Sequence, residues 1–204
     1  YNYSHDNYGG FLLVCNNGSN VHTDRNIGTT NTIIRYNVSI NDGIRPYETK
    51  NRSWFAPTMH ISGSVENTKI YNNVFVIPKK PTKDIDRTIV EMDNWGGPWP
   101  QNTWFANNIF FVEKKADFFF NDDKNTTFRN NCFYGEFENL PEDVAAIFEN
   151  PQFINHAARG NGFEILKNFM LKKSSPLIGK GLSIKNNITK DIMGNSIKEN
   201  PDIG

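Results

Sequence analysis

The chain of 204 residues carries 22 basic and 22 acidic side chains, so its formal net charge is zero. A neutral chain lacks the excess of Lys and Arg that favours nucleic acid or an anionic membrane surface. No apolar run approaches the roughly 18–20 residues that span a bilayer. The length suffices for one domain with a substantial buried core, and two cysteines do not indicate a disulfide framework.

The sequence contains an internal repeat, which is its strongest indication of fold. Each copy begins with Asn-Thr, has Ile or Phe three residues later and has Asn six residues later. Four copies align without gaps: NTIIRYNVSIND from Asn31, NTKIYNNVFVIP from Asn67, NTWFANNIFFVE from Asn102 and NTTFRNNCFYGE from Asn125. The opening YNYSHDN matches the tail of the same unit, so we expect further coils before Tyr1.

The repeated asparagines are Asn2, Asn37, Asn73, Asn108 and Asn131, at spacings of 35 (37−2), 36 (73−37), 35 (108−73) and 23 (131−108) residues. The shortest spacing suits a coil of three short strands and tight turns, and the longer spacings suit the same coil with longer loops. The segments alternate with period 2 and are rich in β-branched and aromatic residues, which favours strands over helices. Asn tolerates left-handed backbone angles, and its amide can bridge coils stacked about 4.8 Å apart, so we interpret these residues as scaffold.

The repeats, the run YNYSHDNYGGFLLVC and the closing section resemble bacterial proteins of the pectate-lyase-like superfamily. The closing section reads NPQF from Asn150, GFEILKNFMLKKSSPLIGKG from Gly162, then DIMGN and PDIG. The resemblance implies an all-β, right-handed parallel β-helix whose coils each contain three strands, named PB1, PB2 and PB3. It also implies a polysaccharide or oligosaccharide partner, a monomer, and an extracellular, periplasmic or cell-surface location. One β-helix fold hosts enzymes and non-enzymes, so the resemblance specifies fold better than activity.

Residues 1–136 are predicted to form coils, and residues 137–204 a C-terminal capping segment. The family pattern places PB2 at each Asn-Thr segment, PB3 directly after each repeated Asn, and PB1 at residues 11–15, 58–63, 88–93 and 117–122. Long loops at 16–30, 41–56, 77–86 and 95–101 are predicted to line a groove beside PB1. Residues 137–150 are predicted to form a short helix, and the rest to cover the open end of the solenoid. Cys15 and Cys132 lie three coils apart, too far for a disulfide, so we predict two buried free thiols.

Alternation along PB1 predicts a group of polar side chains on the outer face. Met59 and Ile61, and likewise Val90 and Met92, should face the core. His60, Ser62, Glu91 and Asp93 should then face outward. Two residues along a strand span about 6.6–7 Å, near the lower limit of the carboxylate separation in an inverting glycosidase. Glu91, Asp93 and His60 are therefore the candidate catalytic residues, although polar side chains on a solvent face need no catalytic role.

Loop residues add candidate substrate contacts. Trp95 and Trp99, in WGGPWP, offer flat apolar faces for sugar rings, or they cover the core beneath the loop. His5 and Arg45 are further candidates for substrate binding. Asp6 with Asp42 of the next coil could bind a cation such as calcium, and no other cofactor is indicated. A polysaccharide lyase would use a Lys or Arg base, and none falls on the predicted outward PB1 positions.

Three functions remain open at the level of sequence. The first is a carbohydrate-active enzyme, a glycoside hydrolase or polysaccharide lyase that acts on an extracellular polysaccharide. The second is a non-catalytic glycan-binding or surface-structural β-helix. The third is an adhesin or phage-type spike, which would normally be a trimer. An enzyme should bring His60, Glu91 and Asp93 together in an exposed groove with an aromatic wall, whereas a module should leave them dispersed or covered.

Overall fold

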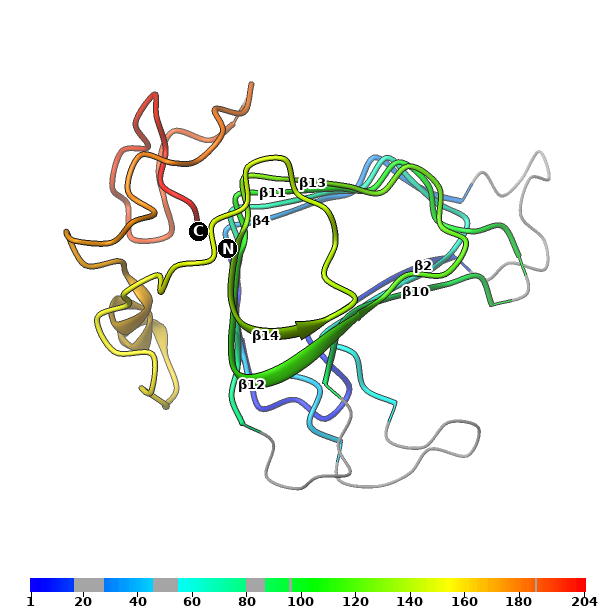
Figure 1. Ribbon diagram of the computed structural model, residues 1–204, viewed down its shortest axis with the longest axis horizontal. Helices are drawn as coiled ribbons and strands as arrows, with labels where there is room; N and C mark the ends of the chain where they lie inside the picture. The colour runs from blue at the N-terminus through cyan, green and yellow to red at the C-terminus, as the bar shows by residue number, and fades with distance from the viewer. Residues whose placement is uncertain (17–27, 46–54, 80–86, 96, 186) are drawn as a thin grey trace.

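The computed structural model describes residues 1–16, 28–45, 55–79, 87–95, 97–185 and 187–204, and it is a parallel β-helix. All pairings between its named strands are parallel, and each strand pairs with the equivalent strand of the next coil. The coils therefore superpose when viewed along the stack (Figure 1). Among the described residues, no helix has the length and apolar character needed to cross a membrane.

The three walls of the solenoid match the predicted strand classes. The PB1 wall contains β2 (Leu12–Asn16), β6 (Met59–Gly63), β10 (Thr88–Asp93) and the end of β12 (Ile109–Phe119). The PB2 wall contains β4 (Ile33–Arg35), β8 (Lys69–Tyr71), β11 (Trp104–Ala106) and β13 (Thr127–Arg129). The PB3 wall contains β1 (Tyr3–His5), β5 (Val38–Ile40), β9 (Val74–Ile77), the start of β12, and the start of β14 (Cys132–Glu138), whose end pairs with the PB1 part of β12. Two short strands, β3 (Thr29–Thr30) and β7 (Val65–Glu66), pair at a corner.

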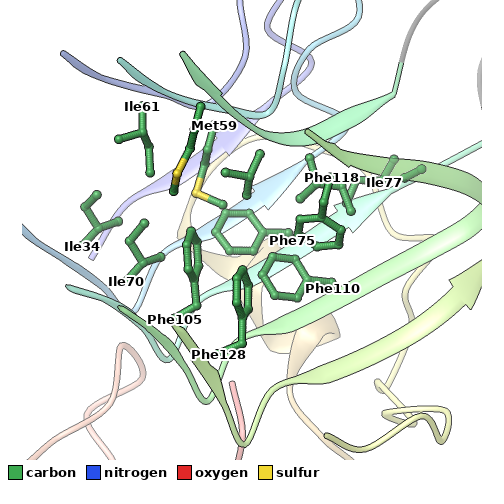
Figure 2. Packing of buried hydrophobic residues seen from close by; sticks show 14 of the residues in the cluster. Ile34, Met59, Ile61, Ile70, Phe75, Ile77, Phe105, Phe110, Phe118 and Phe128 are labelled. Carbon is green, nitrogen blue, oxygen red and sulfur yellow. The ribbon is translucent and has the colours of Figure 1, made fainter. Parts of the chain in front are cut away.

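The interior is filled by side chains that stack in columns from coil to coil (Figure 2). The Ile or Phe found three residues into each repeat forms the PB2 column, because Ile34, Ile70, Phe105 and Phe128 lie in register. The rings of Phe105 and Phe128 are parallel, with centroids 4.4 Å apart. On the PB3 wall, Phe110 stacks between Phe75 and Phe133, at 5.3 and 5.2 Å. Such offset aromatic pairs stabilise by about 0.5–1.5 kcal/mol beyond burial.

The repeated asparagines form a continuous hydrogen-bonded ladder, as predicted. Each Nδ2 donates to the Oδ1 of the next rung, over 2.8–2.9 Å from Asn2 through Asn37, Asn73 and Asn108 to Asn131. The sequence interpretation misplaced the left-handed backbone, however. The residue before each inner rung has positive φ, namely Tyr36, Asn72, Asn107 and Asn130, whereas the rungs themselves do not. The ladder asparagines thus contribute their side-chain amides, whereas the residues before them adopt the left-handed backbone that the turn requires.

The predicted helix at residues 137–150 is absent. Asp143 and Ile147 instead form isolated parallel bridges with Phe128 and Cys132, so this stretch begins one more partial coil. The Asp143 carboxylate replaces the next ladder asparagine and accepts the Nδ2 of Asn131 over 2.7 Å. The chain has a single named helical element, the 3₁₀ helix η2 (Phe163–Phe169), among its described residues.

The C-terminal segment is irregular, as predicted, but it covers a side of the solenoid rather than its end. Figure 1 shows residues beyond about 150, in yellow, orange and red, outside the PB3 wall. The outward side chains of this wall are apolar and form a second buried cluster with Phe153, Leu166, Phe169, Leu177 and Ile203. The later PB3 segments, VFVI in β9 and IFFV at the start of β12, are apolar on both faces, a pattern that indicates burial on both sides. The C-terminal segment therefore buries the outer apolar face of the PB3 wall and not an open strand edge.

Both cysteines are free, as predicted, but only Cys132 is fully buried. Burial raises the pKa of the Cys132 thiol to about 12, with a smaller contribution from the charge of Glu149. Cys15 lies on β2 in register with Ser62 and is half-buried.

Candidate functional site

The candidate catalytic residues lie on two adjacent PB1 strands, β6 and β10. The register pairs Glu91 with His60, and Asp93 with Ser62. The alternating residues Met59, Ile61, Val90 and Met92 are fully buried in the main core, as predicted. Because side chains alternate along a strand, His60, Ser62, Glu91 and Asp93 share the opposite face.

Asp93 is the centre of this group. Its Oδ2 lies 3.1 Å from the Nε2 of His60. Its Oδ1 accepts a hydrogen bond from the Ser62 hydroxyl and another, of 3.2 Å, from the backbone N–H of Trp95. An ionised carboxylate can only accept, so Nε2 of His60 donates to it when Asp93 is charged. Three groups therefore fix the orientation of one carboxylate.

A tight turn places an aromatic ring beside the group. Trp95 has a φ of 44°, which is unusual for a large side chain. The Gly97 N–H donates to the Asn94 carbonyl and closes the turn. The Trp95 ring then lies edge-on to His60, with centroids 5.1 Å apart. The ring of Phe55 makes an equivalent contact with His60, also at 5.1 Å.

Exposure differs sharply across the group. His60 and Glu91 are only 6% and 3% exposed, whereas the Asp93 side chain is 20% exposed and Trp95 is 45% exposed. The predicted residues therefore converge, but the surface that they offer to a ligand consists of Asp93 and Trp95. The long loops predicted to line a groove fall largely on residues 17–27, 46–54 and 80–86, which lie outside the described residues.

Four other predicted site residues lie at the PB3–PB1 corner of the first coils, namely His5, Asp6, Asp42 and Arg45, whereas Trp99 follows β10. His5 ends β1, and its Nδ1 lies 2.8 Å from Oδ2 of Asp6. Arg45 is half-buried, and its guanidinium lies near Gly9. Trp99 is half-buried, and among the described residues no ring contact or hydrogen bond connects it with His60, Glu91 or Asp93.

The two carboxylates predicted to bind a cation are engaged by protein donors. Asp42 is buried, and it accepts hydrogen bonds from the backbone and side chain of Asn7 and from the Ser39 hydroxyl, at 2.6–3.0 Å. Burial alone would raise the pKa of Asp6, but hydrogen bonds from Asn41 and His5 lower it overall. Among the described residues, no three His, Cys, Asp or Glu side chains are grouped to hold a metal. Calcium binding by Asp6 and Asp42 stays a prediction.

Sequence reasoning did not assign a role to Ser62 or Phe55. Ser62 is two residues after His60, so the same alternation that selected His60 could have selected it. Phe55 lies in a loop, and no periodicity relates a loop residue to the PB1 face.

A scan against models of known protein families finds no match, and a search of curated proteins finds no significant relative. The parallel strands, the buried asparagine ladder and the aromatic stacks place the chain among parallel β-helix proteins by architecture.

Proposed function

We propose that the protein is a carbohydrate-active β-helix protein of the pectate-lyase-like superfamily, and that it hydrolyses an extracellular polysaccharide. The observation that carries the proposal is the Asp93 carboxylate, which is partly open to solvent and held by Ser62, His60 and the backbone of Trp95. The exposed ring of Trp95 supplies a flat apolar surface in the same turn. Sugars present both apolar C–H faces and hydroxyl donors, so an aromatic ring beside a fixed acceptor suits them.

In this proposal, two carboxylates divide the work of hydrolysis. An inverting glycosidase needs one acid to protonate the leaving oxygen and one base to activate water on the other face of the sugar. Asp93 takes the role of base, because three donors hold it as an acceptor. Glu91 takes the role of acid, two residues away on the same strand face. His60, bonded to Asp93 and in register with Glu91, positions the base.

A polysaccharide lyase has less support than a hydrolase. Its base would be Lys or Arg, and the outward PB1 positions carry neither within the part of the chain that the structure describes. These positions hold Leu13 and Cys15 on β2, His60 and Ser62 on β6, Glu91 and Asp93 on β10, and Phe119 at the end of β12.

One observation favours a second candidate, a non-catalytic glycan-binding β-helix. Glu91 is 3% exposed, so a sugar could reach it only if the cover over it opened. Binding through Asp93 and Trp95 alone requires no such opening.

Activity on a panel of plant, algal and host polysaccharides tests the proposal and separates the two candidates. The chain would be compared with Asp93→Asn and with the matched control Glu142→Gln, which alters an exposed acid on the partial coil. New reducing ends with wild type and the control, but not with Asp93→Asn, would support hydrolysis. Unsaturated products absorbing near 235 nm would refute the assigned base. Glycan binding without turnover, weakened by Asp93→Asn, would replace the enzyme with the binding module.

A further inference from the structure

A cavity of about 340 Å³ lies between the PB3 wall and the C-terminal segment, away from the PB1 face that carries Asp93. Its floor is a column of outward side chains from three successive coils, because Val38, Val74 and Ile109 lie in register. Leu166 and Phe169, both from η2, also line it. All five side chains belong to the buried apolar cluster that joins the C-terminal segment to the coils.

The cavity falls within the size range of small-molecule sites. Protein interiors are close-packed, and voids much larger than a water molecule are few. Sites for small molecules typically occupy about 300–1,000 Å³ and have mostly apolar walls with a few polar groups. This cavity meets both conditions. Its lining reaches the surface at Asn195, Ser196 and Lys198, which are exposed and provide an entrance.

The polar groups of the lining indicate that the ligand is uncharged. The Asp191 carboxylate accepts hydrogen bonds from the backbone N–H groups of Met193 and Asn195 and from the Asn195 amide, at 2.8–2.9 Å. The Asp202 carboxylate accepts the Gly179 N–H over 2.8 Å. These two acids stabilise turns, and Lys198 is exposed at the entrance. The charged groups of the lining are thus two acids already bonded to protein donors and one exposed lysine, and the rest of the wall is mostly apolar.

We propose that this cavity binds a small, uncharged and largely apolar molecule, such as one built on one or two aromatic or alicyclic ring systems. The site is independent of the proposed hydrolysis, because it uses the outer face of PB3 and the segment packed on it. Binding would also stabilise the packing of the C-terminal segment on the coils, because the coils and the segment form opposite walls of the cavity.

The uncharged fluorophore N-phenyl-1-naphthylamine is a suitable probe. We expect saturable binding at one site per chain, followed by fluorescence and confirmed by calorimetry, with a rise in the melting temperature. Val74→Phe places a ring on the floor of the cavity and should weaken binding at least tenfold. Val144→Phe is the matched control, because Val144 is 89% exposed and does not line the cavity.

A second pair of variants keeps the test decisive if Val74→Phe fails to fold. Met193→Trp fills the cavity from its wall, and Leu140→Trp adds the same ring at a partly exposed position outside the lining. Loss of binding in Met193→Trp with retention in Leu140→Trp and in Asp93→Asn would support the proposal. It would be overturned by the absence of saturable binding to the wild type. Equal affinity in a folded cavity-filling variant and its control would overturn it as well.

Discussion

Replacing the ladder rung Asn108 by Ala is the most direct test of how the coils are held together. Asn108 is fully buried, and its amide makes four hydrogen bonds. Its Oδ1 accepts from the backbone N and Nδ2 of Asn73, at 3.1 and 2.9 Å. Its Nδ2 donates to the Ile70 carbonyl and to Oδ1 of Asn131, both at 2.9 Å. The φ of Asn108 is not positive, so Ala introduces no backbone strain.

The expected loss of stability follows from this count. Each intramolecular hydrogen bond contributes about 1 kcal/mol net, and a buried donor left without a partner costs about 1–3 kcal/mol. Asn108→Ala removes four bonds and leaves the backbone N–H of Asn73 without its acceptor. Some of the other groups keep a second partner. We therefore expect the free energy of unfolding to fall by about 3–5 kcal/mol.

Urea denaturation followed by circular dichroism measures the change. The control is Asn125→Gly, because Asn125 is exposed, lies outside the ladder and donates one amide hydrogen bond, of 3.2 Å, to Asn102. Gly tolerates the φ of 58° at this position, so the control should lose less than about 1 kcal/mol. A loss below 1 kcal/mol in Asn108→Ala, equal to the control, would refute the view that the asparagine ladder stabilises the stack.

Three further predictions concern separate parts of the molecule. Burial raises the pKa of Tyr36 to about 12, although its hydrogen bond from Asn187 opposes this. The unfolded chain therefore loses the phenol proton first, so stability should fall between about pH 10 and 12, and Tyr36→Phe should flatten that slope in pH-dependent melting. Because the pKa of Cys132 is raised to about 12, iodoacetamide at pH 8.5 should modify this thiol only after unfolding, as peptide mass mapping would show. Trp95→Ala should weaken glycan binding at least tenfold in affinity electrophoresis while Trp99→Ala does not, and equal effects would contradict the role of Trp95 at the site.

The fold could be predicted because the repeat specifies the stacking. Residues at the same place in each repeat occupy the same place in each coil, so the columns at Ile70 and Phe105 and the ladder at Asn73 follow from alignment alone. The prediction failed where the repeat ends. Pro141 and the acidic residues after it favour a helix start. The Asp143 carboxylate instead accepts hydrogen bonds from the backbone N–H and Nδ2 of Asn131, and these bonds keep this stretch packed on the last coil.

The candidate site was predictable only in part. Alternation in β6 and β10 correctly separates inward Met59 and Met92 from outward His60 and Asp93, and the register brings the outward pair together. Burial of the outward residues could not be predicted, because it depends on loops that share no period with the strands. Phe55 and Trp95 cover His60 from two such loops.

The end of the ladder provides a test of this reasoning at a single position. Oδ2 of Asp143 accepts the backbone N and Nδ2 of Asn131, just as each Asn rung accepts from the rung before it. Its Oδ1 faces two more donors, the backbone N–H groups of Asn130 and Ala145, both at 2.9 Å. An Asn here would turn an amide NH₂ toward donors, so the position requires a carboxylate although every earlier rung is Asn. Asp143→Asn should therefore cost about 1–3 kcal/mol in urea denaturation, whereas the same change at exposed Asp122 should be neutral. If Asp143→Asn were as stable as the wild type, the four hydrogen bonds that the carboxylate accepts would not explain why Asp rather than Asn ends the ladder.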